Sequence, residues 1–199
     1  MKRIVHLMLG LAMVTTALTG CGEDPAAPPA GASDADLLAA GWSAYDAGDT
    51  AVARARFGEM LAAGTLVAAA HDGLGWCFAR ESAADSASAH FAAAASLADP
   101  DSPLSDDAHA GQAFARDALG DRTGSLDAAA CVPADWSLDH APFLDRDDVT
   151  LLEAVCHYAL GQFAASLAKV QALDPGFSAD IETAAGRAAL AARIATWTS

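Results

Sequence analysis

The stretch GWSAYDAGDTAVARARF (41–57) decides the fold, because a related stretch, GWCFARESAADSASAHF, follows it at positions 75–91. The offset is 34 residues, and the matching pairs are Gly41/Gly75, Trp42/Trp76, Ala53/Ala87 and Phe57/Phe91. A fixed period of this length is typical of proteins built from stacked structural repeats. The sequence therefore predicts an array of short repeating units.

Each unit reads as a pair of helices. Asp34 is a candidate N-cap for a first helix that runs to about Ala47, after which a Gly-Asp pair interrupts the pattern. A second helix is predicted over 50–63, and it places an alanine and a phenylalanine on one face, four residues apart. Alanine is abundant and runs of β-branched residues are few, which favours closely packed helices.

The order small-Gly-x-x-apolar followed by Ala-x-x-x-Phe resembles the tetratricopeptide repeat. The residues that carry this resemblance are Ala40-Gly41 with Ala53-x-x-x-Phe57, and Leu74-Gly75-x-x-Phe78 with Ala87-x-x-x-Phe91, Ala94 and Pro100. The resemblance implies an all-α fold over 34–199, a helical-hairpin solenoid of about four TPR-like repeats with a C-terminal capping helix.

The later units match this pattern less well. A third unit begins at Ala110-Gly111-x-x-Phe114; we expect its turn to be about two residues longer and its second helix to be short, near 125–131. A fourth unit covers YALGQFAASLAKVQALDP (158–175). The final helix is predicted over 180–197, with Ser178 as a candidate cap, and would cover the exposed end of the stack.

In tetratricopeptide arrays the first helix of each pair lines a concave groove. The resemblance implies that the groove of this chain contains Trp42, Tyr45, Trp76, Arg80, Gln112, Arg116 and Tyr158. The chain has a formal net charge of −15, so two arginines close together suggest a site for a carboxylate or phosphate group. The alternative is that the tryptophans fill spaces between repeats and the arginines neutralise nearby aspartates.

One segment departs from the repeat pattern. CVPADWSLDHAPFLDRDD (131–148) is longer than an ordinary connection between repeats and carries Trp136 and Phe143. Long connections in compact domains are usually functional or folded over the surface. Either this segment plugs a gap in the irregular third unit with its two aromatic side chains, or it is a lid over a small-molecule site.

The beginning of the chain reads as a targeting segment. Residues 1–20 combine a basic start with an apolar run, as a secretory signal peptide does. Leu18-Thr19-Gly20-Cys21 resembles the lipobox of bacterial lipoproteins, which implies cleavage before Cys21 and acylation of that residue. Residues 21–33 then form a Pro/Ala/Gly tether. Gly22 implies export to the outer membrane if the cell has two membranes; an ordinary signal peptide is the alternative.

The composition argues against several functions. The formal net charge is −15 and only two lysines occur, so binding to nucleic acid is not expected. We recognise no catalytic motif, no cofactor motif and no metal-binding motif: His71, His90 and His109 are each 19 residues apart, without the spacing of a zinc site. The chain is therefore expected not to be an enzyme.

Three cysteines remain if Cys21 carries lipid. Cys77 and Cys156 occupy equivalent positions in units that other helices separate, so a disulfide between them is not expected. A Cys131–Cys156 disulfide is the remaining candidate in an oxidising compartment. The alternative is that all three are buried thiols that act as small apolar residues.

These features together predict a lipid-anchored protein of the bacterial envelope whose groove binds a protein or peptide, as an adaptor or scaffold. Its partner is not identified by the residues. Two alternatives remain: a structural subunit of an envelope complex without a peptide groove, and a small-ligand binder that uses 131–148 as a lid.

Overall fold

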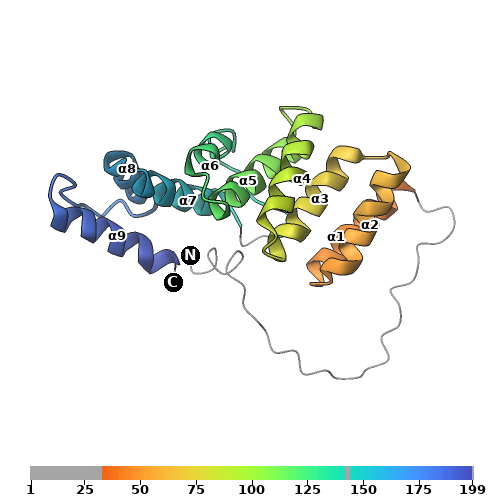
Figure 1. The fold of residues 1–199 in the computed structure, drawn as a ribbon, viewed down its shortest axis with the longest axis horizontal. Helices are drawn as coiled ribbons and strands as arrows, with labels where there is room; N and C mark the ends of the chain where they lie inside the picture. The colour runs from red at the N-terminus through yellow and green to blue at the C-terminus, as the bar shows by residue number, and fades with distance from the viewer. Residues whose placement is uncertain (1–32, 142–143, 199) are drawn as a thin grey trace, which may run out of the picture.

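The computed structural model describes residues 33–141 and 144–198, and this part of the chain is all-α, with nine helices packed in sequential pairs (Figure 1). The predicted signal peptide (1–20), Cys21, most of the predicted tether and Phe143 lie outside the described residues. In chain order the helices are α1 (Asp34–Asp46), α2 (Thr50–Ala63), α3 (Val67–Arg80), α4 (Ala84–Leu97), α5 (Pro103–Ala118), α6 (Arg122–Ala129), α7 (Arg146–Ala159), α8 (Phe163–Leu173) and α9 (Ala184–Thr198).

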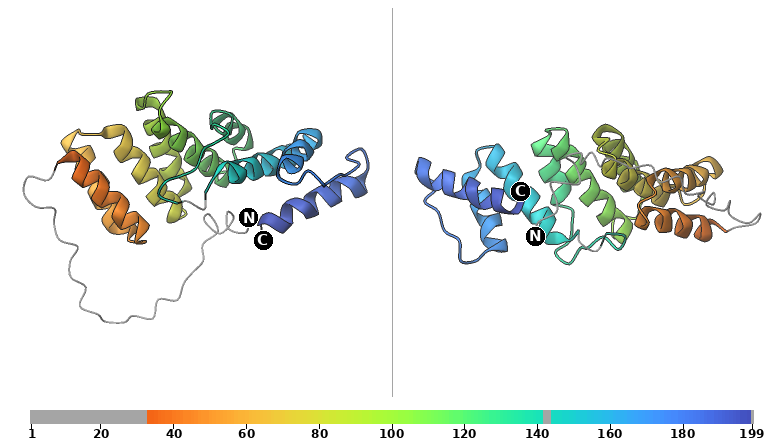
Figure 2. Two further views of the ribbon diagram at one scale, coloured as in Figure 1. Left: turned by 180° about the vertical axis from the view of Figure 1, so that it is seen from behind. Right: turned by 90° about the horizontal axis from the view of Figure 1, so that it is seen from below.

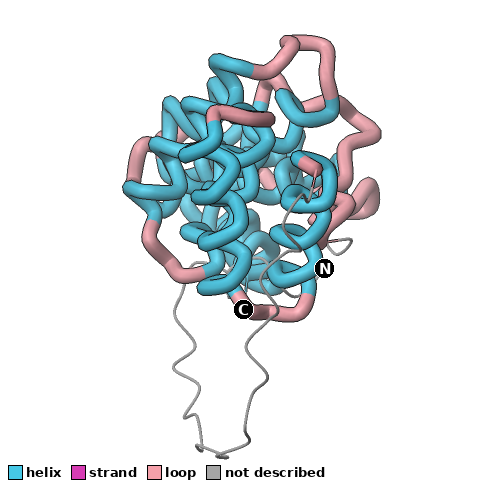
Figure 3. The backbone as a smooth tube through the Cα atoms, turned by 90° about the vertical axis from the view of Figure 1, so that its right-hand side faces the viewer, coloured by secondary structure: helices cyan, strands magenta, loops and turns pink. Residues whose placement is uncertain are grey.

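The helices follow one another along the long axis of the molecule, from α1 and α2 at one end to α8 and α9 at the other (Figures 1 and 2). Seen along the array, they stack one behind another (Figure 3). The prediction of an all-α array is confirmed, as is the second helix over 50–63. Within the described residues, no helix is long and apolar enough to cross a lipid bilayer.

The turns within the pairs give the true register of the four units. Each first helix ends two residues before a residue with positive φ, and these are Gly48, Ser82, Gly120 and Gly161, which are 34, 38 and 41 residues apart. Three of the four are glycines, as a left-handed backbone favours.

Two hydrogen bonds confirm this register. Ser125 Oγ donates to the Ala113 carbonyl oxygen and Ser166 Oγ donates to the Ala154 carbonyl oxygen, both at 2.8 Å. In both pairs the two residues are 12 positions apart, as Ala53 is from Gly41. Ala113 is therefore the equivalent of Gly41 in the third unit, and the longer turn predicted there was wrong.

Two further boundaries differ from the sequence prediction. The second helix of the third unit is α6, which begins earlier than expected because the Asp121 side chain accepts a hydrogen bond from Gly124 N–H and caps it. The last helix begins at Ala184, after a turn in which Thr183 N–H donates to the Asp180 carbonyl oxygen. Thr183 Oγ1, and not Ser178, accepts from the first turn, from Gly186 N–H at 3.0 Å.

Close approach of the helices depends on glycines that face phenylalanines. The buried Phe57 ring lies between Gly41 on α1 and Gly73 on α3, and a Cβ atom on either glycine would lie within 2.5 Å of a ring carbon. Phe91 lies in the same way between Gly75 and Gly111. Each phenylalanine of a second helix therefore joins its own first helix to that of the next unit.

The core is divided at α7. One cluster of buried side chains extends from Tyr45 on α1 to Cys156 on α7, and a second, smaller one joins α7 and α8 to α9 through residues such as Leu151, Leu190 and Trp197. α7 contributes side chains to both clusters, which its high proportion of buried residues allows.

The segment between α6 and α7, of which the structure describes residues 130–141 and 144–145, is called the α6–α7 connection, and these described residues are folded onto the array. A bridge pairs Ser137 with Asp145, and Leu138 N–H donates to the Leu144 carbonyl oxygen at 3.0 Å. Trp136 is only 6% exposed and belongs to the main core. The plug interpretation is thus supported for Trp136.

The α6–α7 connection also contacts the first helix of the array. The His140 ring stacks on the Trp42 ring, with centroids 3.9 Å apart and planes 5° from parallel. Its Nδ1 atom lies 3.5 Å from an Asp46 carboxylate oxygen. Sequence analysis did not anticipate this contact between the fourth unit's entry and the first unit.

Candidate functional site

The structure does not place the predicted groove residues on one open surface. Tyr45 and Trp76 are each 1% exposed, and the Trp76 ring packs edge-on against Phe91 at 5.1 Å. Arg80 lies with its guanidinium carbon 3.6 Å from the centre of the Tyr45 ring and donates to the Tyr45 carbonyl oxygen. Tyr45 and Arg80 thus fill the space between the first two units, and Trp76 packs within the second. The alternative interpretation, that these side chains fill spaces in the array, is supported, and none is an open anchor for a partner.

The third unit's predicted residues are also engaged internally. Gln112 is buried, and Arg116 donates from Nη1 to the Gly124 carbonyl oxygen at 3.0 Å. The prediction failed here because it equated Gly111, instead of Ala113, with Gly75. In the observed register, the corresponding positions are Phe114, Asp117 and Ala118.

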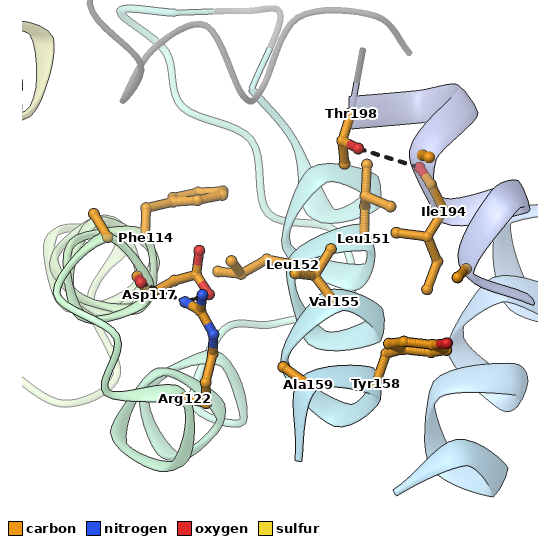
Figure 4. Close-up of a pocket in the computed structure, with 13 residues that line it drawn as sticks. Phe114, Asp117, Arg122, Leu151, Leu152, Val155, Tyr158, Ala159, Ile194 and Thr198 are labelled. Carbon is orange, nitrogen blue, oxygen red and sulfur yellow. Dashed lines mark hydrogen bonds and ion pairs between the residues drawn. The ribbon is translucent and has the colours of Figure 1, made fainter. Parts of the chain in front are cut away.

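These three residues do line a pocket, together with their equivalents in the fourth unit. The pocket has a volume of about 550 Å³ and lies along α7, between α5 and α9 (Figure 4). Its residues are Phe114, Asp117, Ala118, Arg122, Leu151, Leu152, Val155, Tyr158, Ala159, Ala191, Ile194, Ala195 and Thr198. Tyr158 is thus the one predicted groove residue that lines it. We call it the α7 pocket.

The geometry of the α7 pocket is that of a trough. α7 forms the floor, and α5 and α9 stand on either side of it (Figure 4). Leu152 and Val155 project from the floor, and Ile194 faces them from α9. The site is mostly apolar because α7 and α9 line it largely with Leu, Val, Ile and Ala side chains.

The polar groups of the α7 pocket have partners in the chain. Arg122 forms an ion pair with Asp117, and the Cys156 thiol donates to the same carboxylate at 3.2 Å. Burial raises the pKa of Cys156 to about 12, so this cysteine stays a thiol and is a poor nucleophile. Tyr158 Oη donates to the Arg187 carbonyl oxygen at 3.2 Å. The pocket offers apolar surface beside one ion pair, an arrangement suited to binding.

Sequence reasoning missed Arg122 and the α9 residues of this pocket. Arg122 begins a second helix, a position for which the repeat pattern predicts no groove contact. Ile194 and Ala195 belong to a helix that was expected only to close the stack. The sequence did contain a signal for this pocket: α9 is rich in alanine, and such small side chains leave the trough open.

A second pocket lies at the other end of the array. It has a volume of about 480 Å³ and is lined by Ala35, Leu38, Ala39, Trp42, Ser43, Asp46, Leu66 and His140. The α6–α7 connection contributes one residue here, His140, and contributes none to the α7 pocket. The proposal that this segment is a lid therefore finds no support at the larger, apolar site.

The predicted Cys131–Cys156 disulfide is not formed in this structure. Cys131 is exposed and its thiol donates to the Asp127 carbonyl oxygen at 3.7 Å, whereas Cys156 is buried beside Asp117 and Ser125. Cys77 is a buried free thiol. The alternative interpretation, that all three cysteines are buried thiols, holds for Cys77 and Cys156 but is wrong for the exposed Cys131.

A buried carboxyl group lies on α3, close enough to Asp107 on α5 to feel its charge. Asp72 is 1% exposed, and neither its Oδ1 atom nor the Trp76 Nε1 atom makes a hydrogen bond within the described residues. Burial, and then the charge of Asp107, raise the pKa of Asp72 well above its usual range. Burial also raises the pKa of Asp107 to about 6, although a 2.7 Å hydrogen bond from Trp136 Nε1 opposes this shift.

These shifts predict that Asp107→Asn stabilises the protein mainly at neutral pH. A carboxyl whose folded pKa is raised binds more protons in the folded state, so its unfavourable contribution is lost as the pH falls through about 6. We expect the variant to raise the free energy of unfolding by about 1–2 kcal/mol at pH 7.5, and we expect this advantage to fall to about a third of that near pH 4.5.

Urea titrations of both proteins at several pH values would measure this difference. Their comparison cancels the opposing effect of His71, His90 and His109, whose pKa values burial lowers and which favour unfolding in acid. A difference that is constant between pH 4.5 and 7.5 would contradict the prediction.

Comparisons of this chain with protein-family models, with curated proteins and with solved structures find no match.

Proposed function

We propose that this chain is a lipid-anchored protein of the bacterial envelope, built from TPR-like repeats, whose α7 pocket binds an apolar segment of a protein or peptide partner. The lipobox-like sequence that ends at Cys21 supports the anchor and the location. The sequential helix pairs and the Ala-x-x-x-Phe pattern of the first two units support the repeat type.

One observation carries the binding proposal. Equivalent positions of two successive first helices line a single apolar pocket: Phe114, Asp117 and Ala118 on α5, and Val155, Tyr158 and Ala159 on α7. In a repeat array, a partner segment that lies across the first helices contacts such positions in succession. The function is then recognition, in which Leu151, Val155 and Ile194 receive apolar side chains of the partner.

Replacing Ala195 with lysine tests the proposal. Ala195 is exposed on α9 and lines the α7 pocket, so a lysine there places a long charged side chain at the trough. We expect capture of the partner from solubilised membranes, with Cys21 intact, to fall at least about tenfold, because desolvating a charge is unfavourable. Crosslinking followed by mass spectrometry would measure the captured protein.

Ala192→Lys is the matched control, since Ala192 is exposed on the same helix and does not line the pocket. Both variants should keep the helicity of the parent protein. Equal capture by both variants and the parent would contradict the proposal and favour a structural subunit that docks through another surface.

The pocket volume favours one second candidate. About 550 Å³ lies within the range of small-molecule sites, roughly 300–1,000 Å³. A small apolar ligand would raise the unfolding temperature of the parent and of Ala192→Lys but not that of Ala195→Lys, in the absence of any protein partner.

A further inference from the structure

Two histidines that the sequence separates meet on the second helical pair. His71 lies on α3 and His90 on α4, and their Nδ1 atoms are 2.8 Å apart. One ring must carry a proton at Nδ1 and the other must accept it, because two unprotonated nitrogens at this distance would repel each other. Both side chains are partly exposed, so solvent and ions can reach them.

The His90 ring is held in place by its neighbours. Phe78 stacks on it, with ring centroids 5.3 Å apart and planes 15° from parallel. Arg54 on α2 lies 4.8 Å from the centre of the Phe78 ring and forms an ion pair with Glu81 at 2.7 Å. This arrangement restricts the rotation of His90, which reduces the entropy that would be lost when its nitrogen binds a ligand.

The surroundings of both histidines favour the neutral form, which is the form in which imidazole binds metals. Burial lowers the pKa of His71. Burial, and then the charge of His71, lower the pKa of His90.

We propose that His71 and His90 chelate a divalent first-row transition metal, Cu²⁺ or Zn²⁺, through their Nδ1 atoms. Imidazole nitrogen is a preferred ligand of both ions, and Cu²⁺ binds such sites more tightly. Two nitrogens bound to one tetrahedral ion at about 2.1 Å are roughly 3.4 Å apart, so the Nδ1 atoms need to separate by about 0.6 Å from their 2.8 Å distance, with a small turn of the rings toward the ion.

Binding of the metal requires only a change of tautomer at one of the two histidines. The ring that carries its proton at Nδ1 changes to the Nε2–H tautomer, with solvent carrying the proton, and both Nδ1 lone pairs then point at the metal. No proton is released overall. Within the described residues no group of three or more His, Cys, Asp or Glu side chains could hold a metal, so water completes the coordination. The sequence analysis expected no metal site because residues 19 apart lack a recognisable spacing.

Titration of the full chain with Cu²⁺ alone, and separately with Zn²⁺ alone, tests the proposal. We expect one ion per chain, a rise in unfolding temperature, and a Cu²⁺ electron paramagnetic resonance spectrum with two equatorial imidazole nitrogens. His71→Gln and His90→Gln should each weaken binding at least about tenfold and leave a spectrum with one such nitrogen.

His157→Gln is the matched control, because His157 is also partly exposed and its Nδ1 atom lies 2.6 Å from Gln162 Oε1 and not beside a second histidine. It should bind as the parent does. Failure of the unaltered chain to bind one ion would overturn the proposal without any variant, and so would equal affinity of the parent and His90→Gln. Neither outcome bears on the α7 pocket, which contains neither histidine.

Discussion

Replacing Trp136 with alanine is expected to lower the free energy of unfolding by about 3–5 kcal/mol, the cost of removing a buried tryptophan. Trp136 belongs to the α6–α7 connection, is 6% exposed and packs into the main core. The substitution leaves a cavity and also leaves the Asp107 carboxylate without its 2.7 Å hydrogen bond. Urea titration, followed by far-UV circular dichroism, would measure the loss.

Trp136→Phe separates the two contributions. Phenylalanine retains most of the apolar volume but cannot donate to Asp107, so we expect a loss of about 1–2 kcal/mol. The pKa of Asp107 should rise further in this variant, because the indole N–H lowers it in the parent. If Trp136→Ala costs less than about 1 kcal/mol, the α6–α7 connection is not part of the core.

Replacing Gly111 with alanine is expected to destabilise the protein by about 2 kcal/mol, although alanine is the better helix former. The new Cβ atom would lie 2.3 Å from two ring carbons of Phe91. The ring cannot retreat, because Gly75 lies so close on its other side that a Cβ atom there would be 2.6 Å from the ring. Overpacking of this kind costs about 1–3 kcal/mol or more, which exceeds the gain of about 1 kcal/mol in helix propensity.

Gly58→Ala is the same substitution in a helix without the close contact, since nothing lies within 4 Å of a Cβ atom there. It should stabilise the protein by about 0.5–1 kcal/mol. The double variant Gly111→Ala with Phe91→Leu should lose less stability than the sum of its single changes, because the two sites are in contact. Equal effects of Gly58→Ala and Gly111→Ala would show that the glycine–phenylalanine contact is unimportant. Equilibrium urea unfolding measures all of these proteins.

Much of the fold could be predicted from the repeated stretch. The Gly-Trp and Ala-x-x-x-Phe phrases specify how helices approach each other, and that packing is local to successive units. The register of the third unit could not be predicted, because Ala110-Gly111 imitates Ala40-Gly41 while the true equivalent position holds Ala113. Gly41 packs against Phe57, which follows it in the same unit, whereas Gly111 packs against Phe91 of the preceding unit. The sequence alone does not distinguish these two roles of a glycine.

The site was harder to predict than the fold. The repeat pattern assigned Tyr158 to the first helix of the fourth pair, where α7 places it. The pattern carries no information on which parts of that helix surface are covered by other side chains. Trp76 is buried by its neighbours, whereas Val155 lies in an open trough because α9 presents small side chains. The pair His71 and His90 depends on the angle between two helices, which residue spacing does not reveal.

The contact between His140 and Trp42 changes how the array should behave as a whole. Repeat proteins whose units touch only their neighbours can fray from one end, and their folding can begin at any unit. Here the first helix is held by a residue about a hundred positions later, so this contact cannot form until a large loop has closed. This stacking contact therefore forms only after the α6–α7 connection has been synthesised, and until then the indole of Trp42 packs only against residues of its own unit such as Tyr45 and Phe57.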